Sequence, residues 1–242
     1  MARQWDPFWI EAIQTQFIPQ IKTVVEVLKE RLLPNIRPED IEAEAEKISE
    51  EKWEEFMSSP GTGKEDPGDF VNPALNAGIS HFGLMMGIRQ GLLNLFTVAL
   101  YHTFEQQAMY FHRKNVLHID EESDDKLFKL SEFQRRLEEL DIRITKFASW
   151  PKINGELRRV ANAVKHAEGG SAGRLRQIRP DLFRHPLLSS SSLLSSPTYL
   201  PVFQPLIGDG LCVSLNDIED YRDHLVRFWH EFADLLQGNC QP

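Results

Sequence analysis

The sequence predicts an all-α protein, and three observations support that prediction. Apolar residues recur at spacings of three and four over most of the chain, which is the period of one helix face. Helix start and stop signals divide this pattern into segments; examples are Pro38 in a first turn and Gly169-Gly170 after a last turn. The longest pattern typical of a strand is only Leu211-Cys212-Val213.

Two helices are expected in the first 60 residues. The first runs from Trp5 to Leu33 and contains Pro19, which should kink or break it because proline has no backbone N–H. The second starts at Pro38 and runs to about Phe56; it is amphipathic but weakly apolar, so we expect it on the surface. A loop rich in proline and glycine follows between Ser58 and Pro73.

Four further helices are expected after this loop. They run from about Asn76 to Lys114, from about Asp124 to Phe147, from Trp150-Pro151 to Gly169-Gly170, and from a cap at Asn216 or Asp217 onward. Residues 171–214 lack the pattern and include a Ser/Pro-rich run, so we expect a long irregular loop there, either functional or disordered. The chain thus divides into an N-terminal helical segment (1–60), a linker (61–75) and a helical domain (76–242) with an insertion at 171–214.

Charge is distributed unevenly along the chain. The net charge is −9, and −7 of it lies between Glu39 and Glu55, where nine acidic residues meet two lysines. Between Glu156 and Arg179, six Arg/Lys and two Glu give a net charge of +4. The acidic total therefore does not exclude nucleic acid, because a local basic surface attracts phosphates. The acidic helix is expected either to dock near the basic surface of its own or a partner subunit, or to remain an ordinary solvated face.

Several other kinds of site lack support in the sequence. Cys212 and Cys240 make neither a disulfide framework nor a metal site, so free thiols in a reducing cytoplasm are expected. Gly61-Thr62-Gly63-Lys64 lacks the preceding strand and the Ser/Thr of a phosphate-binding loop. We therefore expect a cytoplasmic protein without a metal or cofactor, and the N-terminus shows no signal-peptide core.

The most apolar run of the chain lies between Phe82 and Leu100. It contains Arg89, Gln90 and Asn94, and three such polar residues favour a buried core helix over a membrane span. No membrane association is expected.

The strongest functional signal lies between Glu156 and His166. A helix turns by about 100° per residue, so Arg159 and His166 share one face and Asn162 lies one turn from each. The opposite face is apolar and consists of Leu157, Val160, Ala161, Val164 and Ala167. Histidine transfers protons near neutral pH and arginine binds phosphate, so these side chains suffice for metal-free cleavage of RNA.

Each polar residue of this segment has an expected role. We assign proton transfer to His166, the phosphate contact to Arg159, and orientation of the imidazole or a second phosphate contact to Asn162. The basic residues nearby are expected to hold the RNA backbone: Arg158, Lys165 and Arg174. The alternative is that the motif is a solvated polar face without function.

The spacing Arg-x(4–6)-His is weak evidence by itself, because it occurs at two other places. Arg113 to His118 lies where the long helix should end and is a rival, whereas Arg179 to His185 contains Pro180 and is not expected to be helical.

One broad face of the long helix is also rich in ionisable residues. It contains His102, Glu105 and His112, whose order does not match the Glu-x-x-His motif of bundle metal sites. We expect a supporting role for His102 and Glu105 as buried partners of Arg159 or His166, or membership of a core network.

The segment from Leu157 to Gly169, followed by Ser171-Ala172 and Arg179-Pro180-Asp181-Leu182-Phe183, resembles bacterial helical proteins of the HEPN superfamily. The long-helix segment Tyr101 to Gln107 is similar too, and the resemblance spans roughly residues 76–237. It implies a HEPN-like helical bundle, in a superfamily where many members are metal-independent endoribonucleases of toxin–antitoxin, abortive-infection and other antiphage systems. It also implies a dimer in which two Arg-x(4–6)-His motifs form one site, with Arg159 and His166 as the site residues.

Two positions depart from the pattern of the superfamily. Val160 stands where a polar residue often follows the arginine, and Asn162 is the nearest substitute. Ala167 stands where toxins silenced by tyrosine modification have a tyrosine, so that form of silencing is not expected.

The expected function is therefore metal-independent endoribonuclease activity in antiphage defence or a toxin–antitoxin system. Expected partners are RNA, a second copy of the chain in a homodimer or larger even-numbered oligomer, and a regulatory or antitoxin protein. The apolar long helix and the helix with Phe228 and Trp229 are the expected dimer interface. The alternative is a non-catalytic HEPN-like adaptor or sensor subunit of a defence complex, since the acidic helix and the serine-rich loop suit partner binding.

Overall fold

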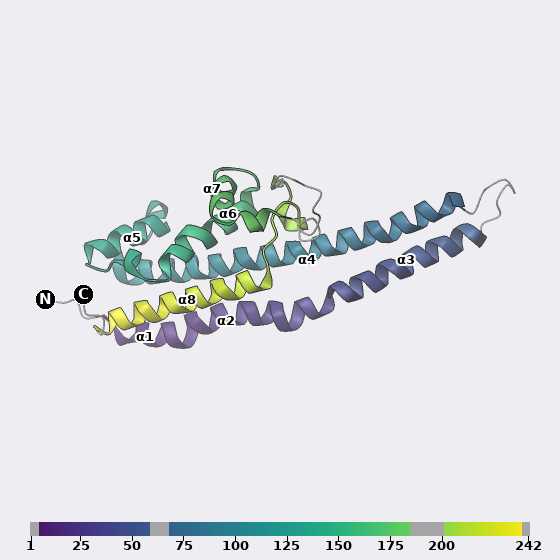
Figure 1. Ribbon diagram of the computed structural model, residues 1–242. Coiled ribbons are helices and arrows are strands. Elements are labelled where there is room, and N and C mark those ends of the chain that lie inside the picture. Colours follow the sequence, from purple (N-terminus) through teal and green to yellow (C-terminus); the bar gives the residue numbers. More distant parts are fainter. Residues whose placement is uncertain (1–4, 59–67, 185–200, 239–242) are drawn as a thin grey trace.

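The structure is a computed structural model of the 242-residue chain, and it describes residues 5–58, 68–184 and 201–238. Within these ranges every regular element is a helix and no strand occurs, which confirms the all-α prediction. A compact body of helices lies at one end of the molecule, and a long two-helix hairpin projects from it (Figure 1).

The N-terminal helix is continuous but irregular. It consists of α1 (Pro7–Ala12), the π-helical turn η1 (Ile13–Phe17), α2 (Ile18–Val27), a second π-helical turn η2 (Leu28–Leu32) and the 3₁₀ turn η3 (Leu33–Asn35). Pro19 does not break this helix, because it lies in the first turn of α2, directly after a π-helical turn that has already changed the hydrogen-bonding pattern.

The N-terminal helix belongs to the body rather than to a separate unit. Its apolar face is buried in the same core as α4 and α8, and Phe17 lies 4.8 Å from the ring of Trp229. The Gln107 side chain donates a hydrogen bond of 3.1 Å to the Phe17 carbonyl oxygen. Removal of residues 1–60 would therefore expose a large part of the core.

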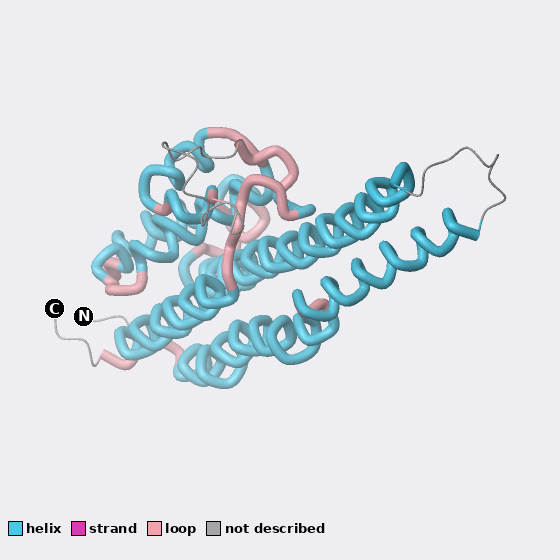
Figure 2. Tube along the Cα trace, turned by 45° about the vertical axis from the view of Figure 1, so that its right-hand side comes forward, coloured by secondary structure: helices cyan, strands magenta, loops and turns pink. Residues whose placement is uncertain are grey.

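The hairpin consists of α3 (Pro38–Ser58) and α4 (Gly68–Phe111), which run antiparallel (Figures 1 and 2). The end of α3 agrees with the prediction, but α4 starts well before Asn76 and includes Pro73, so the predicted loop is too long. The glycine-rich part of that loop lies outside the described residues. The helices approach closely at Gly78, where a Cβ atom would lie 2.4 Å from the Ala45 carbonyl oxygen.

Several short elements follow α4 and place the motif helix. They are the π-helical turn η4 (His112–Val116), the 3₁₀ turn η5 (Asp125–Leu127), α5 (Leu130–Glu139), the 3₁₀ turn η6 (Ile144–Lys146), η7 (Pro151–Leu157, π-helical) and α6 (Arg158–His166). The helix expected from Asp124 to Phe147 is thus limited to α5. The chain leaves it at Asp141, whose φ of 60° is left-handed and incompatible with a continuing helix.

The region after α6 is more regular than expected. A helix, α7 (Gly170–Ile178), and the 3₁₀ turn η8 (Pro180–Phe183) occupy the start of the stretch predicted to be irregular. Residues 185–200, with most of the serine-rich run, lie outside the described residues. The segment from residue 201 to 214 contains only the 3₁₀ turn η9 (Pro205–Ile207).

The last helix, α8 (Leu215–Leu236), begins with a capping box. The cap is Ser214 rather than Asn216 or Asp217, and the Asp217 carboxylate bonds back to the Ser214 backbone N–H at 2.9 Å. The apolar face of α8 is fully buried, and its aromatic rings form the centre of the core with those of α4.

Two of the three polar residues within the apolar run of α4 have tertiary partners, whereas the buried Nε of Arg89 has no hydrogen-bond partner among the described residues. Asn94 is fully buried and donates hydrogen bonds to the carbonyl oxygens of Pro205 and Leu211, at 2.6 and 2.9 Å. Gln90 donates to the Val213 carbonyl oxygen at 2.9 Å. By length and composition the helix from Val71 to Val116 would be able to cross a membrane, which is weak evidence because core helices pass the same test.

Candidate functional site

The motif helix α6 presents one polar face and buries the other. Arg158, Lys165 and His166 are exposed, and Arg159 and Asn162 are half-buried beside them. The buried face consists of Leu157, Val160, Ala161, Ala163 and Val164. The division that the helical period predicts is therefore present, with Ala163 added to the apolar side.

The polar face of α6 has few partners in the part of the chain that the structure describes. The side chains of Arg159, Asn162, Lys165 and His166 make no hydrogen bond or ion pair there. One guanidinium nitrogen of Arg159 lies against Gly155, 3.6 Å from the position that a Cβ atom would take. Four side chains that can bind phosphate or move a proton are thus available to a ligand.

Two further basic residues expected at the site are Arg158 on α6 and Arg174 on α7. Arg158 donates a hydrogen bond of 3.1 Å to the Asn154 side chain, and its charge acts on Tyr101 of α4. Burial raises the pKa of Tyr101, and the positive charge of Arg158 opposes that rise. Arg174 is exposed on α7, whose glycine-rich first turn starts four residues after His166.

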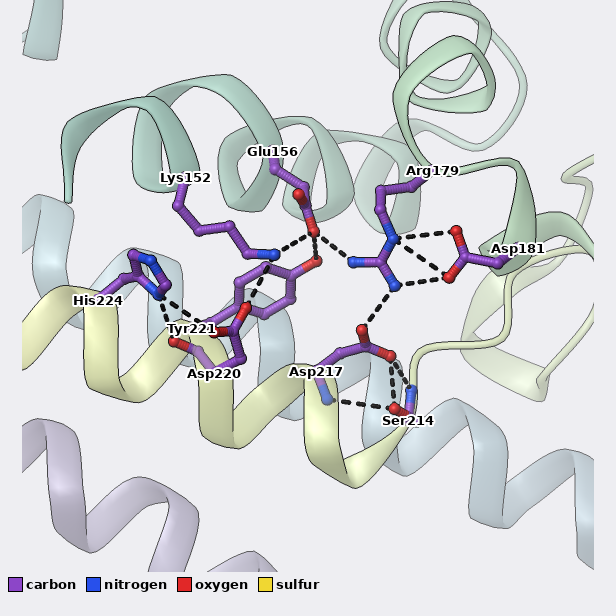
Figure 3. A network of polar contacts seen from close by, with 9 residues as sticks. All are labelled: Lys152, Glu156, Arg179, Asp181, Ser214, Asp217, Asp220, Tyr221 and His224. Carbon is purple, nitrogen blue, oxygen red and sulfur yellow. Dashed lines mark hydrogen bonds and ion pairs between the residues drawn. The ribbon is translucent and has the colours of Figure 1, made fainter. Parts of the chain in front are cut away.

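A polar network fixes the start of the motif helix (Figure 3). Glu156, in the last turn of η7, accepts hydrogen bonds from the Tyr221 hydroxyl at 2.8 Å and from Arg179 at 2.5 Å, and pairs with Lys152 at 2.9 Å. Arg179 also pairs with Asp217 of α8 at 2.6 Å. We call Glu156, Arg179, Asp217 and Tyr221 the α8 clamp, because they join η7 and the turn after α7 to α8.

The charges of the α8 clamp are mutually compensated. Hydrogen bonds to Asp181 and Asp217 raise the pKa of Arg179 above its already high value. Burial raises the pKa of the Tyr221 phenol, and the neighbouring Glu156 carboxylate adds to that rise. All four groups thus use their polar atoms within the protein, which indicates a structural role rather than ligand binding.

A second ion pair fixes the other end of α6. The helix ends at His166, earlier than the predicted Gly169-Gly170, because Ala167 takes a left-handed φ of 58°. Glu168 then pairs with both terminal nitrogens of Arg176 and accepts a hydrogen bond of 2.9 Å from the Val202 backbone N–H. The bond from Arg176 lowers the pKa of Glu168 to about 2. The motif helix is therefore held at both ends.

The residues expected to support the motif pair with each other. His102 and Glu105 form an intrahelical contact of 2.9 Å between Nδ1 and Oε2, and neither hydrogen-bonds to Arg159 or His166. His112 is fully buried, and neither of its ring nitrogens has a hydrogen-bond partner among the residues that the structure describes. Burial lowers its pKa to about 4, so it is neutral at physiological pH.

The rival Arg–His pairs are engaged elsewhere. Arg113 donates two hydrogen bonds to the Glu122 carbonyl oxygen and stacks over the Phe128 ring at 4.5 Å. Arg179 belongs to the α8 clamp, and His185 lies outside the described residues. The α6 motif is therefore the one of the three whose arginine has no protein partner in the part of the chain described by the structure.

Sequence reasoning did not find the α8 clamp. No sequence pattern joined Arg179 to Glu156, and Glu156 and Tyr221 are separated by 65 positions. The local sequence feature that pointed to a member of the α8 clamp was Asp217, an acidic residue expected at the start of the last helix. No cluster of three or more potential metal ligands occurs among the residues that the structure describes.

Comparisons with protein-family models, with curated proteins and with solved structures each found no match to this chain.

Proposed function

We propose that this protein is a metal-independent endoribonuclease of the HEPN type, acting in antiphage defence or a toxin–antitoxin system. The observation that supports this most directly is that Arg159, Asn162 and His166 share one face of α6 and that their side chains have no partner among the described residues. A helix held at both ends positions these groups before RNA binds, which is how an enzyme reduces the cost of orienting its catalytic side chains.

The chemistry that these residues offer is transesterification of RNA. The 2′-hydroxyl loses its proton and attacks the neighbouring phosphorus, and the 5′-oxygen leaves with a proton, which gives a 2′,3′-cyclic phosphate. His166 would transfer a proton, and Arg159 would stabilise the negative charge that develops on the phosphorane oxygens. Asn162 lies between them, and Arg158, Lys165 and Arg174 would hold flanking phosphates.

A homodimer would complete this site. One chain supplies a single imidazole at the motif, whereas cleavage benefits from a base on one side of the phosphorus and an acid on the other. Phe228 and Trp229 are fully buried within their own chain, so these two side chains are not available to an interface. An alternative surface is exposed beside α6, where η9 packs on both α4 and α6 and exposes Leu206 and Ile207.

The first experiment measures cleavage of total RNA or tRNA by the purified full chain, with and without EDTA. Cleavage should survive chelation, and His166→Ala should reduce the rate by about two orders of magnitude or more. His230→Ala is the matched control, because His230 is an exposed histidine on α8, far along the chain from the motif. Loss of activity in EDTA that a divalent metal restores would contradict the proposal.

The second experiment tests the shared site. His166→Ala and Arg159→Ala chains are mixed, and the activity of the mixture is compared with the sum of the separate activities. A composite site predicts that the activity of the mixture departs from that sum, because the mixed dimer joins an intact Arg159 from one chain to an intact His166 from the other. A monomer by light scattering with full activity would exclude the composite site.

One observation favours the alternative, a non-catalytic adaptor. The hairpin of α3 and α4 projects from the body and exposes large apolar side chains, as a docking element does. The adaptor proposal predicts that the wild-type chain cleaves no RNA under any of the conditions above.

A further inference from the structure

The hairpin of α3 and α4 has one face on which apolar and acidic side chains lie in parallel stripes. Gly78 shows which residues of α3 and α4 lie opposite one another. A Cβ atom at Gly78 would lie 2.1 Å from Ser49 Oγ and 2.4 Å from the Ala45 carbonyl oxygen. The residue that follows a contact residue is rotated by about 100° around its own helix axis. In two antiparallel helices, this rotation leads to the same side of the pair. Ile79, Glu46 and Glu50 therefore share one face of the hairpin.

The stripe on α4 is apolar and exposed. Val71, Leu75 and Ile79 follow one another at a spacing of four, and their side chains are 48%, 52% and 58% exposed. Leu75 follows the buried Ala74 by one residue, so it lies on the same side as Ile79. Such a stripe resembles the receiving surface of helix-in-groove recognition.

The stripe on α3 is acidic and uncompensated. Glu42, Glu46 and Glu50 are exposed, also at a spacing of four, and none has an ion-pair partner in the described part of the chain. Like charges at this spacing destabilise a helix.

The other side of α3 differs in this respect. Glu44 pairs with His81, Glu51 with Lys47 and Glu55 with Lys52. Among the described residues, the glutamates of α3 without an ion-pair partner therefore lie on the face that also carries the apolar stripe.

We propose that this face binds a basic amphipathic helix of another protein. Apolar side chains of that helix would contact Val71, Leu75 and Ile79, while its Lys or Arg residues would lie over Glu42, Glu46 and Glu50. A second copy of this chain is a poorer occupant, because pairing two such faces would bring two glutamate stripes together. An anionic membrane is disfavoured by the same repulsion.

The test uses the full chain and a labelled synthetic helix of roughly 18 residues, about five turns, with leucine on one face and lysine on the other. Fluorescence anisotropy should show binding that weakens as salt rises, and a peptide with glutamate in place of lysine should not bind. Neutralising the stripe with Glu42→Gln, Glu46→Gln and Glu50→Gln should weaken binding about tenfold, as three modest ion pairs would.

The matched control carries Glu44→Gln, Glu51→Gln and Glu55→Gln on the other side of α3. It removes the same total charge and should bind the lysine peptide as the wild type does. Equal weakening in both triple variants, or no binding to the wild type, would overturn the proposal. A dimer by light scattering that Ile79→Glu converts to a monomer would also overturn it, because the face would then be occupied by a second copy. RNA cleavage should be unchanged in both variants, so this test is independent of the ribonuclease proposal.

Discussion

The two halves of α4 use similar apolar residues in different ways. In the body, Leu100, Phe104 and Phe111 are completely buried. In the hairpin, Leu75 and Ile79 are more than half exposed. The difference lies in the neighbours: α2, α6 and α8 pack around the C-terminal half of the helix, whereas the hairpin half has mainly the charged α3 beside it (Figure 2). An apolar sequence therefore becomes core only where several other apolar faces surround it.

The largest expected difference between the two regions is the cost of truncating a side chain. Phe228→Ala should lower the free energy of unfolding by about 3–5 kcal/mol, because its ring contacts Phe104 at 5.0 Å and has no exposed surface. Leu75→Ala in the hairpin should change it by less than about 0.5 kcal/mol. Urea unfolding followed by circular dichroism measures both, and similar costs would show that Leu75 is covered in solution.

The second comparison lies within the hairpin and uses two glycines. Gly78→Ala would place a methyl group against the Ala45 carbonyl oxygen and should destabilise the packing of α3 on α4 by about 1–3 kcal/mol. Gly83→Ala meets no atom within 4 Å and should stabilise the helix by about 0.5–1 kcal/mol. Hydrogen exchange should show faster exchange in α3 for Gly78→Ala alone, and protection equal to wild type would contradict the close approach.

The third prediction concerns a buried titratable group of the body. Burial lowers the pKa of His112 from 6.5 to about 4. At pH values between these two, the unfolded chain therefore binds a proton at His112 and the folded chain does not. Stability should therefore fall as pH falls from about 6.5 toward 4, by on the order of 2 kcal/mol at pH 4.5. Carboxylates affect stability in a lower pH range: the pKa of Glu168 is lowered to about 2, so its contribution to folding stability is lost mainly below pH 4.5.

His112→Leu should flatten this pH dependence, whereas His230→Ala, at an exposed position, should preserve it. Unfolding midpoints between pH 7 and pH 4.5 give the measurement. An unchanged slope in His112→Leu would mean that the histidine finds a partner for its proton in solution.

The smallest expected effect tests the α8 clamp. Tyr221→Phe removes the hydroxyl that donates to Glu156 at 2.8 Å and keeps the ring, so it should cost about 1 kcal/mol. Because Glu156 retains Lys152 and Arg179, the motif helix should stay in place and RNA cleavage should be close to that of the wild type. A large loss of cleavage with normal stability would assign Tyr221 to the site itself.

Local patterns in the sequence predicted the features that depend on a single helix. The polar and apolar faces of α6 and the extent of α3 follow from helical periodicity alone. The helix predicted from Asp124 to Phe147 and the helix end predicted at Gly169-Gly170 were wrong, because the left-handed residues Asp141 and Ala167 leave little trace in composition. The chain also continues as a helix past Pro19, where a π-helical turn precedes the proline. The ribonuclease activity and the formation of a homodimer are still predictions.

The sequence by itself determined that the chain is helical and that Arg159, Asn162 and His166 share a helix face, because both depend on the period of 3.6 residues. Only the tertiary structure decided which apolar faces are buried and which charges are paired. Glu156, Arg179 and Asp217 meet because three separate segments fold together, and Glu42, Glu46 and Glu50 stay unpaired because no cation lies beside them in the described chain. Such contacts depend on the distances between segments, and the periodicity of one helix does not determine these distances.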